Sequence, residues 1–100
     1  MNGFKDIIKQ KRKEKNLLLR QVSALVEIDQ SIISKYEKGE RVPSRDHVKR
    51  FAKVYNISEN DLIIAWQSDN LAYKLYQEEN PEKILKVAEN KIKYLKKDKK

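Results

Sequence analysis

Cysteine is absent from this sequence, and glycine, proline and histidine are scarce, with two, two and one residues in 100. Without cysteine, disulfides and thiolate metal sites are excluded. The sequence also lacks glycine-rich phosphate loops and grouped carboxylates, and its lone histidine, His47, argues further against an enzyme, a metal site or a cofactor. No apolar run approaches the roughly 20 residues of a membrane-spanning helix, and the first ten residues lack the apolar core of a signal peptide. We therefore expect a cytoplasmic protein without a membrane segment.

Positive charge is abundant but unevenly distributed. Residues 1–57 hold 14 basic and 7 acidic side chains, residues 58–90 hold 3 and 7, and residues 91–100 hold 6 and 1. The amino-terminal half is therefore a candidate surface for a polyanion such as a nucleic acid, although a basic face can equally be a solvated surface.

The scarcity of glycine and proline, together with apolar residues spaced three and four apart, predicts an all-α fold. The expected helices cover residues 3–15, 19–26, 30–38, 44–55, 58 onward and 81–96. Asn16, Gly39 and Asn56 are expected to end helices, whereas Asp29 and Ser58 are expected to cap them. The pattern leaves open whether the helix from Ser58 breaks at residues 68–70. The side chains expected to face the core include Phe4, Ile7, Ile8, Val22, Leu25, Val26, Ile33, Tyr36, Val48, Phe51, Ala52 and Tyr55.

One segment carries a recognisable combination of motifs. The run LRQVSALVEIDQSIISKYEKGERVPS, followed by the ending ISENDLI, resembles the helix-turn-helix family of phage repressors and Cro, also called the XRE family. The resemblance covers about Phe4 to Ile64, and the chain's size is similar to that of controller proteins of restriction-modification operons. It implies a five-helix, lambda-repressor-like DNA-binding domain with an additional C-terminal helix. We expect domains at residues 1–66 and 67–100.

In this family the second helix of the motif presents its first turn to base edges in the major groove. The resemblance places base contacts at Gln30, Ser31 and Lys35. Glutamine suits adenine, lysine suits guanine, and serine is permissive. Ile32 is expected to point outward, where it could meet a thymine methyl group.

Residues that flank this helix are expected to contact phosphates, which position a protein without specifying sequence. Each of them could instead be an ordinary solvated side chain. The expected phosphate contacts are Arg20, Gln21, Ser34, Lys38, Arg41 and Arg45.

The resemblance also implies an ion pair between Arg12 and Glu37 that fixes helix orientation. Two positions depart from the family pattern. Glu27 replaces the usual turn glycine, at an expected cost on the order of 1 kcal/mol or with an altered turn. Leu18 and Leu19 replace a polar cap and a phosphate-binding glutamine, and packing is the role we expect for them.

The last third of the chain carries an apolar seam at Leu85, Ala88, Ile92 and Leu95. The seam could close over its own domain, pair with the same helix of another subunit, or bind a different protein. Twofold dimers of the family commonly form near the fifth helix. The expected dimer interface therefore comprises Leu62, Trp66, Leu85, Ile92 and Leu95.

Together, these features predict a homodimeric, sequence-specific transcriptional regulator that binds an inverted repeat in double-stranded DNA. The main alternative is an antitoxin-like protein that binds DNA and sequesters a protein partner through its C-terminal helices. A third possibility is a module that coats nucleic acid without sequence preference.

Overall fold

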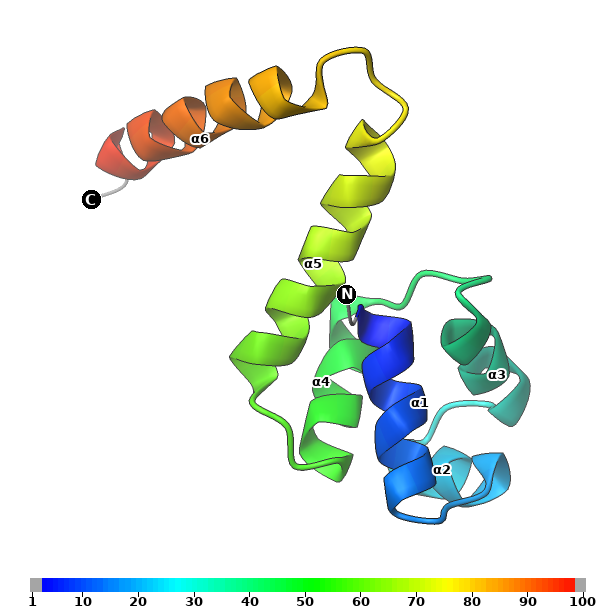
Figure 1. The fold of residues 1–100 in the computed structure, drawn as a ribbon. Coiled ribbons are helices and arrows are strands. Elements are labelled where there is room, and N and C mark those ends of the chain that lie inside the picture. Colours follow the sequence, from blue (N-terminus) through cyan, green and yellow to red (C-terminus); the bar gives the residue numbers. More distant parts are fainter. Residues whose placement is uncertain (1–2, 99–100) are drawn as a thin grey trace. The chain divides into compact units, whose positions relative to one another are not determined.

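The computed structural model describes residues 3–98, and every regular element in that range is an α-helix. The predicted all-α fold of five helices plus one C-terminal helix is therefore confirmed (Figure 1). None of the helices in this range is long and apolar enough to cross a membrane. The elements are α1 (Phe4–Glu14), α2 (Leu19–Val26), α3 (Gln30–Lys38), α4 (Arg45–Val54), α5 (Glu59–Leu75) and α6 (Pro81–Asp98).

The chain divides into two compact units, with the division between Asp69 and Asn70. The sequence suggested a boundary slightly earlier, between residues 66 and 67. Helix α5 runs without interruption through residues 68–70, so the polar Ser-Asp-Asn segment is part of this helix and does not break it.

The core of the first unit is built from all five of its helices. Four of its largest side chains, Ile8, Ile33, Phe51 and Leu62, are fully buried, and α3 contacts both α1 and α2. Leu25 is an exception to the predicted core, because it is 55% exposed. Val22 and Val26 lie four positions apart on the buried stripe of α2, and Leu25 falls to the side of that stripe.

The turns between helices use the stop signals visible in the sequence. Asn16 and Asn56 have φ angles of 54° and 53°, and Gly39 has a φ of 74°. These left-handed conformations favour glycine and are tolerated by asparagine. At the starts of helices, Asp29 accepts a hydrogen bond from the Ser31 backbone amide, as predicted.

The amino-terminal end of α1 is held by a residue distant in sequence. The Phe4 backbone amide donates a 2.8 Å hydrogen bond to Oδ2 of Asp69, on α5. A Cβ atom on Gly3 would lie 2.7 Å from both carboxylate oxygens of Asp69, so glycine permits this close approach. The negative charge also lies at the positive end of the α1 dipole, where it is stabilising. Asp69 therefore links α1 to α5, a role that local sequence patterns did not indicate.

Candidate nucleic-acid interface

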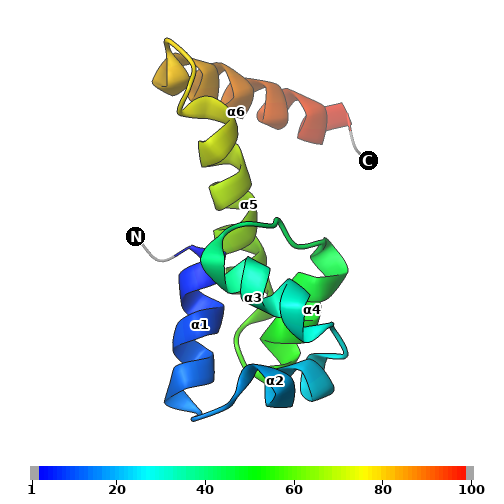
Figure 2. The same ribbon diagram turned by 90° about the vertical axis from the view of Figure 1, so that its right-hand side faces the viewer.

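Helices α2 and α3 form a helix-turn-helix unit, and the view in Figure 2 brings α3 to the front of its domain. The connection between them buries Ile28 and places Ser23 at the junction, where the Ser23 hydroxyl donates to the Ile28 carbonyl oxygen. Glu27 has φ 57° and ψ 47°, so this residue keeps the left-handed conformation that the family usually assigns to glycine. The substitution does not produce a different turn conformation at this residue.

Arg50 of α4 supports this strained turn. Its Nη1 atom donates to the carbonyl oxygens of Val26 and Glu27, at 3.3 and 3.0 Å. Its Nη2 atom also forms an ion pair with Asp46, at 2.8 Å. Carbonyl groups at the end of a helix lack intrahelical donors, and a cation near that end complements the helix dipole. Arg50 therefore fixes the end of α2 to α4, a role missed in the sequence analysis because the contact joins positions far apart in the chain.

The first two turns of α3 present polar side chains to the solvent. Gln30, Ser31 and Lys35 are exposed, whereas Ile32 is half-buried and packs against the core. Part of the Ile32 side chain therefore reaches the surface, where it was expected to point, and the rest contacts the core. The reason is that Ile32 lies beside the buried Ile33, at the edge of the apolar stripe of α3.

Asp29 organises this first turn. Its Oδ1 atom accepts hydrogen bonds from the backbone amide and the hydroxyl of Ser31, at 2.8 and 2.5 Å. These bonds lower the pKa of the Asp29 carboxyl group. The Ser31 hydroxyl proton is therefore directed at Asp29, and its oxygen lone pairs are the part available to a ligand.

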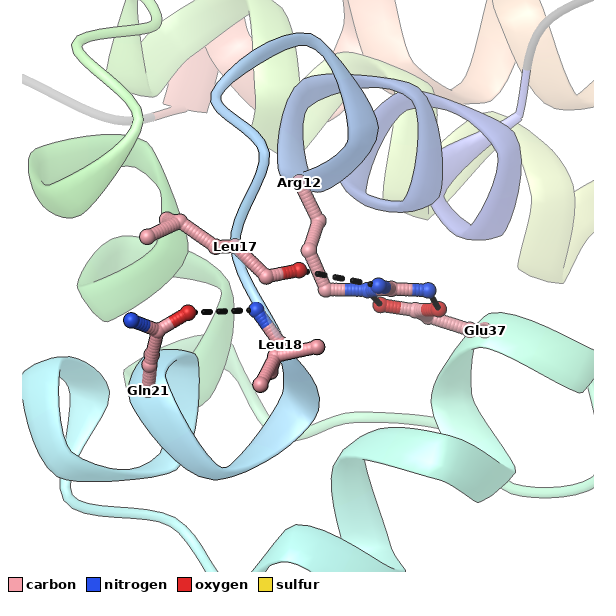
Figure 3. A network of polar contacts seen from close by, with 5 residues as sticks. All are labelled: Arg12, Leu17, Leu18, Gln21 and Glu37. Atoms are coloured by element: carbon pink, nitrogen blue, oxygen red, sulfur yellow. Dashed lines mark hydrogen bonds and ion pairs between the residues drawn. The ribbon is translucent and has the colours of Figure 1, made fainter.

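Arg12 and Glu37 form the ion pair that the sequence implied, and Figure 3 shows their planar groups facing each other. Nε and Nη2 of Arg12 donate to the two carboxylate oxygens of Glu37, at 2.8 and 2.9 Å. A further bond of 3.1 Å joins Nη1 to the Leu17 carbonyl oxygen. Glu37 is only 8% exposed, and its hydrogen bond raises the pKa of Arg12. This two-point contact fixes α3 against α1.

Helix α2 begins without the usual polar cap. The Leu18 backbone amide donates to Oε1 of Gln21, at 2.7 Å (Figure 3). The Leu18 side chain has no acceptor atom, so it cannot accept the second hydrogen bond of a capping box from the Gln21 backbone amide. Only half of a capping box is therefore formed. Leu19 packs against the core as expected, whereas Leu18 is 52% exposed and does not serve packing. Gln21 retains its amide nitrogen as a donor.

The residues expected to contact phosphate lie before, within and after the recognition helix α3 along the chain. Within residues 3–98, none of the four basic members forms an ion pair, and all four are exposed, whereas Ser34 is half-buried. The guanidinium carbon of Arg45 lies 5.4 Å from the centre of the Trp66 ring, in a cation–π arrangement. The four basic residues are Arg20, Lys38, Arg41 and Arg45.

A side-chain hydrogen bond connects α3 to α4 near this surface. Tyr36 Oη lies 2.7 Å from His47 Nδ1, and burial, followed by the nearby charge of Arg50, lowers the pKa of His47. The lowered pKa favours the neutral ring, in which Nδ1 can accept the tyrosine proton. His47 thus connects the two helices, which is a structural role.

Two residues expected at a dimer interface lie in the core of the first unit. Leu62 is fully buried and Trp66 is 8% exposed. Leu62 therefore has no surface to offer a second subunit, because its face of α5 packs against the other helices of the same domain. The seam residues Leu85, Ile92 and Leu95 are all exposed.

The exposed first turn of α3, held by an N-cap and by an ion pair to α1, defines a helix-turn-helix DNA-binding domain. The comparison with known families agrees, because the family described as helix-turn-helix matches residues 8–62. The chain belongs to this XRE-type family of DNA-binding transcription regulators, which is not a family of enzymes. No curated protein and no solved structure gives a significant match to the chain.

Proposed function

We propose that this protein is a sequence-specific transcriptional regulator that binds an inverted-repeat operator as a homodimer. The observation that carries the proposal is the solvent-exposed first turn of α3, whose orientation is fixed by the Arg12–Glu37 pair. A rigid helix with short polar side chains at its exposed end fits the major groove, which is roughly 12 Å wide.

In this proposal, Gln30 and Lys35 read bases directly. The Gln30 amide can pair with the N6 and N7 positions of adenine, and the Lys35 ammonium group can donate to guanine O6 and N7. Ser31 contributes chiefly an acceptor, since its hydroxyl proton is directed at Asp29. The partly exposed side chain of Ile32 can touch a thymine methyl group.

The residues expected to contact phosphate are proposed to bind the DNA backbone and to fix the position of α3 along the major groove. Arg20, Lys38, Arg41 and Arg45 can each supply one cation per subunit, and Ser34 and Gln21 can add neutral donors. Roughly 6 to 10 phosphates neutralised by a dimer would make affinity fall steeply with salt. The cation–π contact of the Arg45 guanidinium group with the Trp66 ring supports a phosphate contact at that position.

The proposed dimer would place the two α3 helices about one turn of DNA apart, roughly 34 Å, on successive major grooves. A twofold arrangement of subunits requires a twofold-symmetric DNA site. The dimer would block or assist polymerase bound nearby.

The proposal is tested by selecting duplexes from a random DNA pool at about 150 mM salt, which weakens purely ionic binding. Enrichment of an inverted repeat with half-site centres about 10 base pairs apart is the expected result. A pool that stays random would contradict sequence-specific binding and favour the nonspecific module. Enrichment of isolated half-sites alone would contradict the dimer while leaving base recognition in place.

A further inference from the structure

Helix α6 exposes an apolar face that its own unit does not cover. No residue of α6 within the described part of the chain is buried, although the helix spans 18 residues. Leu85, Ile92 and Leu95 are 43%, 53% and 64% exposed, and Ala88 is half-buried. Most helix stability in proteins comes from packing of an apolar face. The exposed seam is therefore a candidate surface for a partner.

The spacing of the seam is the same in both directions along the helix. Leu85, Ala88, Ile92 and Leu95 follow one another at intervals of three, four and three residues. If a second α6 packs antiparallel, Leu85 meets the Leu95 position of the other copy, and Ala88 meets the Ile92 position. Each inner layer then joins one small and one large side chain. A parallel pair would instead place alanine against alanine and leave a void, which costs packing energy.

The charges along α6 are also unevenly distributed. Residues 81–89 hold two acidic and two basic side chains, whereas residues 90–98 hold four basic and one acidic. An antiparallel pair brings the basic end of each copy beside the neutral end of the other, and Glu82 lies across from the Lys96 position. A parallel pair would gather the basic ends of both copies together, which is unfavourable.

We infer that α6 is a self-association surface whose occupant is the α6 helix of a second copy of this chain, packed antiparallel along the seam. This inference deepens the proposed function by assigning its dimer contact to α6, and it rests on that function only for the biological role of the dimer. The inferred interface excludes Leu62, which the sequence placed at the dimer contact, because this side chain is buried in the first unit.

The contact is tested by sedimentation equilibrium of the full chain and of two matched variants. Ile92→Glu places a charge in the seam, whereas Tyr94→Glu places the same charge on an exposed apolar residue outside it. The expected result is a dimer for the parent chain and for Tyr94→Glu, with dimerisation of Ile92→Glu weakened by more than about tenfold. A monomeric parent chain, or equal weakening by both variants, would overturn the inference. Near-ultraviolet circular dichroism of Trp66 verifies that the first unit stays folded.

The orientation is tested by disulfide trapping, which the absence of native cysteine makes direct. An equimolar mixture of Glu82→Cys and Lys96→Cys chains is expected to form the mixed disulfide in preference to either symmetric one. Lys93→Cys, on the side of α6 away from the seam, is the control for random collision. Symmetric disulfides in preference to the mixed one, or crosslinking no greater than that control, would refute the antiparallel arrangement.

The same variants separate this inference from the proposed function. If Ile92→Glu remains dimeric and still selects an inverted repeat, the α6 contact is wrong and the proposed regulator stands. If the parent chain dimerises through α6 but selects no sequence from the pool, the α6 contact stands and the proposed regulator fails.

Discussion

Arg50 of α4 donates from Nη1 to the carbonyl oxygen of Glu27, the left-handed residue that turns the chain from α2 into α3. The contact holds the carbonyl group of a turn whose left-handed backbone conformation favours glycine. Because Arg50 acts on the carbonyl group, its stabilising effect does not depend on the side chain at position 27. The backbone strain at Glu27 nevertheless remains, since a Cβ atom is still present in a left-handed conformation.

We therefore expect Glu27→Gly to stabilise the protein. Relief of roughly 1–2 kcal/mol of left-handed strain is partly offset by the larger conformational freedom of glycine in the unfolded chain, for a net gain of about 1 kcal/mol. The gain corresponds to a rise in melting temperature of about 4–8 °C for a domain of this size. Glu27→Ala is the matched control, because it removes the charge but keeps the Cβ atom. Equal stabilisation by both variants would assign the effect to charge and contradict strain at this position.

Loss of either member of the Arg12–Glu37 pair should strongly destabilise the fold. Arg12→Ala or Glu37→Ala leaves the other charge without its partner at a largely buried site, at a cost of about 3 kcal/mol. Replacing both at once, as Arg12→Met with Glu37→Leu, should cost much less, because no unpaired charge remains. Urea unfolding of the three variants measures the difference. If Glu37→Ala changes neither the melting temperature nor DNA affinity, the pair does not fix α3.

The proposed division between base and phosphate contacts predicts different effects for two exposed cations. Lys35→Ala should change which base is preferred at one operator position, with a loss of about 1–3 kcal/mol on the preferred site. Arg41→Ala should weaken binding to all sequences similarly and reduce the slope of affinity against salt by about one. Titrations against the selected operator and its single-base variants measure both effects. Uniform losses for both mutants would refute the division.

The bond between Tyr36 and His47 predicts a pH dependence of stability. The folded-state pKa of His47 is lowered, so its contribution is present above the ordinary value near 6.5 and is lost as pH falls through the lower folded-state value. Protonation removes the acceptor at Nδ1 for the Tyr36 hydroxyl, and one such hydrogen bond contributes about 1 kcal/mol.

The measurement compares melting temperatures of the parent chain and His47→Gln between pH 7.5 and pH 5. The advantage of the parent chain at pH 7.5 should shrink toward pH 5, while carboxylate effects common to both proteins cancel. An advantage that stays constant across this range would contradict the proposed titration of His47.

The tyrosine at position 55 shows which kind of detail only packing determines. Burial raises the pKa of Tyr55 to about 12, and its hydroxyl group has no hydrogen-bond partner among the described residues. The sequence pattern placed this side chain in the core correctly, because Tyr55, the C-cap residue of α4, continues the helical repeat of that helix. The pattern carries no information about whether the hydroxyl group finds a donor or an acceptor.

Local sequence determined the helices and the first turn of the recognition helix. Helices α2 and α3 begin and end where the apolar spacing, Asp29 and Gly39 indicate, because these signals act within one or two turns of the backbone. The resemblance of the motif also indicated the Arg12–Glu37 pair, which spacing alone does not specify.

Tertiary structure decided the features that join positions distant in the chain. These include the support of Glu27 by Arg50, the contact of Asp69 with the amide of Phe4, and the burial of Leu62 in its own domain. Periodicity says which face of a helix is apolar, but it does not say whether that face meets its own chain or another one. Leu62 and Leu95 both lie on apolar faces of their helices, yet only the packing of the five-helix domain shows that the first is buried and the second exposed.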